Sequence, residues 1–210
     1  MLNPTQVESP DNNAWQTWVK ALSAPFIEAG LAPLAIPQQE QFGSLHYFDR
    51  LSAPDAVAGR ATGELVTVII PCFSPDEGLL TSVDSIIKQT YRNLEIIIVD
   101  DASGPAFQDV IAQAEAMDER VSVLQMEHNG GSYIGRRAAL ALTKGTYVTT
   151  QDADDWSHPQ RIEHQVAAFT DEAAATRSDA VRAKDDLTHQ WLGYPAIRNN
   201  ASSLMFRRSF

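Results

Sequence analysis

The sequence predicts an α/β fold, with a doubly wound and mostly parallel sheet preceded by an N-terminal helical extension. From residue 66 onward, short apolar runs alternate with segments in which apolar residues recur at helical spacing. The connections between the runs are long enough for helices, which parallel strands need as crossovers. Polar or glycine-containing segments follow the runs directly, and ligands bind at such strand ends in open α/β sheets.

Four strands are expected in this core. They cover residues 66–70, 94–99, 121–126 and 147–151. The first run is apolar throughout and stops at Pro71, as a strand covered on both faces should. Right-handed crossovers would bring the carboxyl ends of all four strands to one crevice.

Local signals predict where the core helices begin and end. Residues 74–77, Ser-Pro-Asp-Glu, form a capping box, which predicts a helix with proline in its first turn. Apolar residues recur at helical spacing through 107–117. Another helix is expected over 132–143, and a Lys-Gly pair at 144–145 is interpreted as its basic last turn and C-cap. Ser157 is the expected N-cap of the last helix.

Residues 1–65 differ in pattern from the core. An amphipathic helix is expected over 15–31, ending at Gly30. Its apolar side is formed by Trp15, Trp18, Leu22, Phe26 and Ile27. This extension carries no recognisable chemistry, and we interpret it as a structural element or as a collar that binds a partner.

Composition limits the classes of partner. The chain has 210 residues, of which 44% are hydrophobic, so it can bury a proper core within one main domain. The net charge of −11 argues against nucleic acid, or an anionic membrane, as a partner bound through overall charge. An anionic ligand remains compatible with this charge, because a bridging metal ion can oppose the field locally.

The only cysteine, Cys72, excludes an internal disulfide and a cysteine-based zinc site. Because it ends an apolar run, we expect a buried and inert thiol. No apolar run approaches the length of a transmembrane helix. Residues 1–13 lack the basic start and apolar centre of a signal peptide. We therefore expect a cytoplasmic chain without a transmembrane segment.

The acidic segment after the fourth strand is the most informative stretch. Along an extended backbone Asp152 and Asp154 point the same way, while Asp155 points elsewhere. Two neighbouring carboxylates repel each other unless a cation lies between them. Such a pair suits Mg²⁺ or Mn²⁺, hard ions that also hold phosphate oxygens. A solvated acidic turn is the plain alternative, and the position at a strand end favours the metal site.

The other strand ends carry groups that suit a nucleotide. Phe73 could stack on a flat base, and Asp100 or Asp101 could accept a hydrogen bond from a ring N–H. The glycine pair 130–131 would let the backbone approach a ligand, and Arg136 could neutralise a phosphate. Each residue also has an ordinary interpretation as a core, turn, loop or surface residue. Their placement together at successive strand ends favours a binding site.

Four segments carry a resemblance to a known family. They are Val-Thr-Val-Ile-Ile-Pro at 66–71, Ile-Val-Asp-Asp-Ala-Ser at 98–103, Asn-Gly-Gly at 129–131 with Arg136, and Asp-Ala-Asp-Asp-Trp-Ser-His-Pro at 152–159. With these motifs in this order, residues 66–170 resemble the nucleotide-sugar half of the glycosyltransferase family 2 enzymes. The family's GT-A fold has a Rossmann-like nucleotide-binding core.

The resemblance also implies a division of the chain. Residues 1–65 would be the N-terminal extension and residues 66–172 the nucleotide-sugar-binding core. Residues 173–210 would begin an acceptor-side region, because 203–208 resembles the stretch that precedes the family's acceptor-side motif. On this basis the chain is expected to stop before that motif.

The same resemblance implies an activity and roles for individual residues. The expected reaction moves a sugar from a nucleotide-diphosphate sugar, by family habit a UDP-sugar, to an acceptor hydroxyl with inversion. Mn²⁺ or Mg²⁺ would be held by Asp152 and Asp154. The implied nucleotide-binding residues are Pro71, Phe73, Asp100, Asp101, Arg136 and Asp152. The acceptor would be a saccharide or a lipid-linked saccharide in polysaccharide biosynthesis, so a location at the inner face of the membrane is also considered.

The sequence departs from the family pattern in three places. Ser74-Pro75 replaces the common Asn, Ala102 replaces the common Gly after the Asp pair, and Arg137 replaces the common Asn. The first departure affects hydrogen bonding near the base, and we expect the other two to be tolerated.

The general base is not identified, because the resemblance implies a position beyond Phe210. Asp185 and Asp186 lie outside the family's base motif and are equally explained as a solvated turn. A non-catalytic fragment that binds the nucleotide sugar without turnover is therefore the alternative function. A receiver-like signalling domain is more remote, because the Thr and Lys that it needs on later strands are missing. A metal-dependent sugar nucleotidyltransferase would need a Gly-rich loop after its first strand, and residues 71–74, Pro-Cys-Phe-Ser, do not form one.

Overall fold

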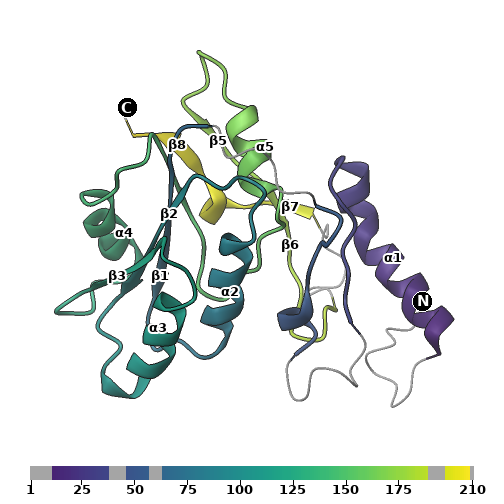
Figure 1. Cartoon of the computed structure of the whole chain (residues 1–210), viewed down its shortest axis with the longest axis horizontal. Helices are drawn as coiled ribbons and strands as arrows, with labels where there is room; N and C mark the ends of the chain where they lie inside the picture. Colours follow the sequence, from purple (N-terminus) through teal and green to yellow (C-terminus); the bar gives the residue numbers. More distant parts are fainter. Residues whose placement is uncertain (1–10, 38–45, 57–62, 189–196, 209–210) are drawn as a thin grey trace. The chain divides into compact units, whose positions relative to one another are not determined.

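The computed structural model describes residues 11–37, 46–56, 63–188 and 197–208 (Figure 1). Its contacts divide the chain into two compact units. The N-terminal unit consists of Met1–Val57 and Asp179–Asn199, and the sheet unit of Ala58–Ser178 and Asn200–Phe210. The division into three regions that the sequence suggests stays a prediction. The contacts add that 179–199 belongs with the N-terminal residues, which no local pattern indicates.

A six-stranded sheet forms the centre of the sheet unit, in the order β3-β2-β1-β4-β8-β5 (Figure 1). The strands are β1 (Val66–Cys72), β2 (Leu94–Asp100), β3 (Val121–Gln125), β4 (Tyr147–Thr150), β5 (Ala175–Thr176) and β8 (Met205–Arg207). β1 to β4 are parallel, whereas β8 runs antiparallel to both β4 and β5. The doubly wound, mostly parallel sheet that the sequence predicts is confirmed.

The helices cover both faces of this sheet. They are α2 (Gly78–Ile87), α3 (Gln108–Glu115), α4 (Ser132–Leu140) and α5 (Arg161–Ala167), with short 3₁₀ turns η4 (Pro105–Phe107) and η5 (Ala201–Ser203). Apolar residues of α2, α3 and α5 pack with Val68 and Ile70 on one face, while Ala139 of α4 packs with Ile69 on the other. Neighbouring residues of β1 therefore enter two different core clusters, which explains why consecutive residues 68–70 are all apolar.

Pro71 lies inside β1 rather than at its end. It is opposite Val99 of β2, whereas the pairing of β1 with β4 stops at Ile69. A proline cannot donate a hydrogen bond to a neighbouring strand. The shorter pairing on the β4 side is what allows the strand to continue through Pro71 to Cys72.

Two predicted helix starts were wrong. No capping box forms at Ser74, because α2 begins only at Gly78 and the Asp76 carboxylate accepts the hydrogen bond from Gly78 N (2.9 Å). Ser157 does not cap α5 either, since that helix begins at Arg161 without a side-chain cap from its own N-cap residue. The Ser157 hydroxyl instead donates to Gln151 Oε1 at 2.7 Å.

Gly145 was also misinterpreted as a helix C-cap. α4 ends at Leu140, and Ala141 is its C-cap residue. A Cβ added to Gly145 would lie 2.6 Å from Thr67 N. Glycine is therefore needed for the close approach of this turn to β1, and Gly145 N donates to Thr67 Oγ1 at 3.0 Å.

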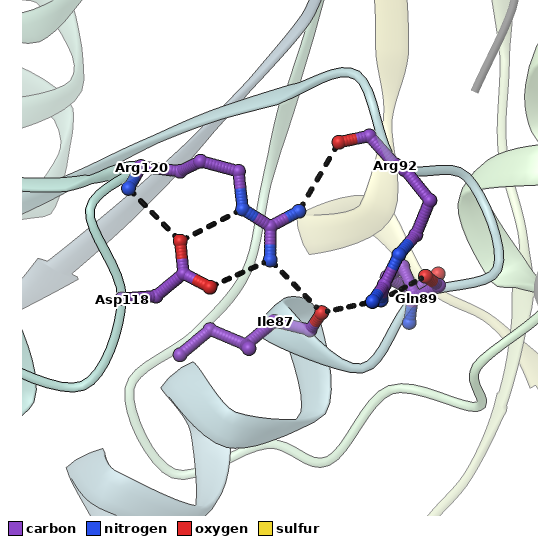
Figure 2. Close-up of polar contacts among 5 residues, drawn as sticks. All are labelled: Ile87, Gln89, Arg92, Asp118 and Arg120. Atoms are coloured by element: carbon purple, nitrogen blue, oxygen red, sulfur yellow. Dashed lines mark hydrogen bonds and ion pairs between the residues drawn. The ribbon is translucent and has the colours of Figure 1, made fainter.

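Two arginines cap the carboxyl end of α2 (Figure 2). Arg120 Nη2 and Arg92 Nη1 each donate to the carbonyl oxygen of Ile87 at 3.1 Å. Asp118 orients Arg120 through hydrogen bonds of 2.8 and 2.9 Å. These contacts satisfy carbonyl groups that a helix end leaves without intrahelical donors. Arg120 holds the pKa of Asp118 down, to about 2.

The N-terminal unit has a small core of its own. Its elements are α1 (Asn12–Glu28), η3 (Phe48–Arg50) and the antiparallel pair β6 (Asp179–Val181) and β7 (Ile197–Asn199). Trp15 and Trp18 pack with Ile36 and with Leu187 from the second segment of the unit. The predicted N-terminal helix is confirmed, although it runs from Asn12 to Glu28 rather than over 15–31. Of the five residues expected on its apolar side, Phe26 and Ile27 do not join this core, and Ile27 is 50% exposed.

Candidate functional site

The predicted site residues follow neighbouring strands at one edge of the sheet. β1 lies between β2 and β4, and the register places Cys72 opposite Asp100. The segments that follow β1, β2 and β4 therefore begin side by side, at the carboxyl ends of parallel strands. Open α/β sheets bind ligands at this edge.

Arg136 and Asp152 meet in an ion pair at this edge. Arg136 Nη2 lies 2.6 Å from Asp152 Oδ1, and the two side chains are 23% and 40% exposed. Arg136 is on the first turns of α4, and its Nη1 also donates to Ser132 Oγ at 3.3 Å. The pair links α4 to the segment after β4, and leaves both charges within reach of a ligand.

The proposed metal ligands are Asp152, which is half-buried, and Asp154, which is exposed. Within the described residues there is no group of three or more Asp, Glu, His or Cys side chains that could form a closed metal site. A pair of carboxylates nevertheless fits Mg²⁺ or Mn²⁺, because these ions can complete their coordination shell with oxygen atoms from phosphate and water.

The Asp pair after β2 is buried and already hydrogen-bonded. Asp100 is fully buried, and its two oxygens accept from Ser103 N (2.9 Å) and Gln108 Nε2 (3.0 Å). Asp101 is 3% exposed and accepts from Gly130 N (2.9 Å) and Gly131 N (2.7 Å). Asp101 therefore holds the turn that leads into α4.

Phe73 is the residue that follows β1, and its large apolar side chain is 57% exposed. The following residue, Ser74, has φ +49°, and its N–H donates to Ser103 Oγ at 2.9 Å. This contact ties the segment after β1 to the segment after β2.

Ala102 adopts a left-handed backbone conformation, with φ +62°. Residues with a Cβ adopt this conformation at a cost of roughly 1–2 kcal/mol, which glycine avoids. The substitution that we expected to be tolerated therefore places a strained residue directly after Asp101.

Cys72 lies beneath the site and is buried, as predicted. Burial, together with the smaller effect of the charges of Asp100 and Asp101, raises the pKa of its thiol to about 12. A thiol with this pKa is not a nucleophile near neutral pH.

The structure also places near the candidate site three residues that sequence reasoning missed. Ser82 and Ser85 of α2, and Gln89 just after this helix, are buried and hydrogen-bond to the segment that carries the two proposed metal ligands. The two serines lie three residues apart, on one side of the helix, and this spacing was the available signal. Buried Arg161, the first residue of α5, donates to Thr150 O at 3.2 Å, and burial lowers its pKa to about 10.

Asp185 and Asp186 lie in the N-terminal unit. The Asp186 carboxylate accepts hydrogen bonds from Thr188 N (2.9 Å) and Thr188 Oγ1 (2.6 Å), and the Asp185 carbonyl accepts from Phe48 N (3.0 Å). These contacts are typical of a turn, the ordinary interpretation of this pair.

Comparisons with known proteins point to one family. The model of the family described as "Glycosyl transferase family 2" matches residues 67–208. The glycosyltransferase GlyG of Streptococcus pneumoniae is 36% identical over 100 residues, which are 48% of this chain and 33% of GlyG. The glucosyltransferase WfaP of Escherichia coli, named for UDP-Glc and GlcNAc-diphosphoundecaprenol, is 33% identical over 103 residues, 49% of this chain and 40% of WfaP.

Solved structures share the fold. One is the mannosyltransferase PcManGT of Pyrobaculum calidifontis in complex with GDP-Man and Mn²⁺. Its TM-score is 0.51 and its sequence identity is 22%, and the match covers 61% of this chain and 39% of the PcManGT chain. S. aureus TarS has a TM-score of 0.52 at 21% identity over 69% of this chain and 28% of its own. This chain thus spans well under half the length of these relatives. No helix in the described residues is long and apolar enough to cross a membrane.

Proposed function

Because this chain belongs to glycosyltransferase family 2, we propose that it binds a nucleotide-diphosphate sugar at the carboxyl edge of its sheet and serves in the transfer of the sugar to an acceptor hydroxyl. The observation that carries the proposal is the pairing of Arg136 with Asp152 at 2.6 Å. A cation and a carboxylate in one partly exposed site can together bind a metal–diphosphate complex, because the carboxylate can bind the metal ion and the cation can bind the diphosphate.

Each residue of the site receives a role in this proposal. Asp152 and Asp154 bind Mn²⁺ or Mg²⁺, which supplies Lewis-acid stabilisation of the diphosphate leaving group when bound. Arg136 binds the diphosphate, to which a guanidinium can donate two parallel hydrogen bonds. Phe73 stacks on the base, and Pro71, two residues before it, is a further proposed nucleotide contact.

Base recognition falls to the Asp pair after β2. Asp100 is fully buried, so Asp101, at 3% exposed, is the better placed of the two. A carboxylate oxygen has two lone pairs, which lets Asp101 accept a hydrogen bond from a ring N–H as well as those from the glycine turn. Asp100 then serves to hold Asp101 and Ser103 in place.

The proposed reaction is a single displacement at the anomeric carbon. The acceptor oxygen forms a bond to this carbon as the bond to the diphosphate oxygen breaks, which inverts the configuration. The hydroxyl proton passes to a carboxylate that acts as general base, and this base is not assigned to a residue of the chain. A saccharide or lipid-linked acceptor is proposed because the name of WfaP includes a lipid-linked one.

Ligand-dependent stability tests the proposal. UDP with Mn²⁺ at a hundred times its dissociation constant should stabilise the folded chain by about 2.7 kcal/mol. UDP is proposed because the name of WfaP includes UDP-Glc, and GDP serves as the competing nucleotide. Asp154→Asn should abolish the Mn²⁺ dependence without unfolding the chain. A folded wild-type chain that is not stabilised by either nucleotide with Mn²⁺ would refute the proposal.

A further inference from the structure

Three buried polar side chains form a stripe along α2 and the turn that follows it. Ser82 and Gln89 are fully buried, and Ser85 is 3% exposed. Ser82 and Ser85 lie three residues apart, on one side of the helix, and Gln89 comes two residues after the last helical residue, Ile87. The stripe lies beside the apolar residues Leu79, Val83 and Ile86, which fill the main core cluster.

The first two residues of the stripe hydrogen-bond to the segment between β4 and α5. Ser82 Oγ donates to the carbonyl oxygen of Asp152 at 2.9 Å, so one metal-site residue is held directly by its backbone. Ser85 Oγ accepts from Ser157 N at 3.1 Å, five residues further along the same segment.

Gln89 uses both ends of its amide group. Its Nε2 donates to His158 O at 2.9 Å and to Ser85 O at 3.0 Å. Its Oε1 accepts from Ile162 N at 3.0 Å, which is an amide in the first turn of α5. Helix starts leave such amides without intrahelical partners. Gln89, in the turn after α2, therefore supplies the cap that α5 lacks in its own sequence.

We propose that Ser82, Ser85 and Gln89 are positioning residues that fix the direction of the Asp152 and Asp154 carboxylates. This inference rests on the proposed function of that pair. Residues 151–160 contain no helix or strand, and the stripe hydrogen-bonds to the backbone of three of them, Asp152, Ser157 and His158, and to that of Ile162 in α5. Metal and diphosphate ligands must be held to within about half an ångström, so a shift of this segment should weaken metal binding.

A purely structural role makes a different prediction. Each hydrogen bond of the stripe contributes to stability wherever it lies, and its loss costs about 1–3 kcal/mol when a buried group is left unpaired. A structural role lowers stability alone, whereas a positioning role also lowers the affinity for the metal. The comparison needs a control variant with an equal loss of stability.

Thr67→Val is that control. Thr67 is fully buried on β1, and its hydroxyl donates to Glu95 Oε2 (2.6 Å) and accepts from Gly145 N (3.0 Å). These partners lie near the amino ends of the strands, opposite to the site edge. Thr67→Val keeps the shape of the side chain and removes its hydrogen bonds.

Ser82→Ala and Gln89→Met should lower the apparent Mn²⁺ affinity, measured by calorimetry at saturating UDP, about tenfold. Thr67→Val should leave the Mn²⁺ affinity within twofold of wild type, although its free energy of unfolding, measured in urea, should fall by a similar amount. Hydrogen exchange across 151–163, which needs no ligand, should rise in the first two variants only. If Gln89→Met fails to fold, Ser82→Ala carries the comparison.

The inference would be overturned if a folded Ser82→Ala variant bound Mn²⁺ with wild-type affinity, or if its hydrogen exchange across 151–163 were unchanged. A wild-type chain that binds no UDP with Mn²⁺ would refute the proposed function instead. In that case the proposed effect of the stripe on metal binding is refuted as well. Hydrogen exchange then reports only whether the stripe orders residues 151–163.

Discussion

The carboxylate of Asp101 accepts a hydrogen bond of 2.7 Å from the backbone N–H of Gly131. Gly131, with φ +79°, is the N-cap residue of α4, the helix that carries Arg136. The end of β2 therefore determines where α4 begins, and a residue proposed for base recognition also positions the residue proposed for the diphosphate.

Asp101→Asn tests this double role. The asparagine side chain has the same size, but one carboxylate oxygen that accepts from a backbone N–H is replaced by an NH₂ group, which can only donate. We expect a loss of about 1–3 kcal/mol in urea unfolding. Calorimetry should show weaker binding of pyrophosphate with Mn²⁺, because the turn and Arg136 shift, and a larger loss for UDP with Mn²⁺. Equal losses for the two ligands would remove Asp101 from the base site.

Ala102→Gly should stabilise the chain. The substitution relieves a left-handed backbone strain of roughly 1–2 kcal/mol, and the greater freedom of glycine in the unfolded chain offsets about half of this gain. We expect a net gain of about 0.5–1 kcal/mol in urea unfolding. Ala112→Gly, at an exposed position within α3, should instead cost about 1 kcal/mol. A destabilised Ala102→Gly variant would contradict the proposed strain.

Arg136→Met should affect metal and nucleotide in opposite directions. Without the guanidinium 2.6 Å from Asp152, Mn²⁺ alone should bind several-fold more tightly, a modest effect because the pair is partly exposed to solvent. UDP with Mn²⁺ should bind at least tenfold more weakly, since a phosphate partner is lost. Titration calorimetry measures both affinities. The neighbouring exposed Arg137 provides the control: Arg137→Met should change neither, and equal effects of both variants would indicate a general charge effect.

Asp118→Asn should reveal a pH-dependent contribution to stability. The Asp118 pKa is lowered to about 2 in the folded chain, mainly by its hydrogen bond from Arg120. Its contribution is therefore complete above the unfolded pKa of about 4 and is lost as the pH falls toward 2. We expect the variant to be about 1–2 kcal/mol less stable at pH 7. Urea unfolding at several pH values should show this difference shrinking below pH 4, and a constant difference would contradict the assignment.

The sequence predicted well those features that depend on neighbouring residues. The apolar runs located β1 to β4, and their order implied that Asp101, Arg136 and Asp152 would meet at one edge. Helix starts were predicted poorly, because the groups that satisfy them come from elsewhere. Gln89, just after α2, caps the first turn of α5, and a distant glutamine leaves no trace in the local pattern around Ser157.

Contacts over long sequence distances account for the other errors. Gly145 resembled a helix cap, but its role is to let a turn approach Thr67, 78 residues earlier in the chain. The pairing of 179–199 with the N-terminal residues depends on side chains such as Leu187, whose partners no spacing rule identifies. Position at the strand ends suggested the proposed site carboxylates, whereas the hydrogen bonds from Ser82, Ser85 and Gln89 to their segment required the three-dimensional structure.

The shared core of Trp15, Trp18 and Leu187 also sets an order of events on the ribosome. About 170 residues separate Trp18 from Leu187, and at roughly 5–20 residues per second their synthesis takes on the order of ten to thirty seconds. During this time the two indole rings lack the leucine that completes their core. Until Leu187 emerges, only N-terminal residues such as Ile36 and Leu51 are available to pack with the two rings, and slower translation through 58–178 would delay completion of this core.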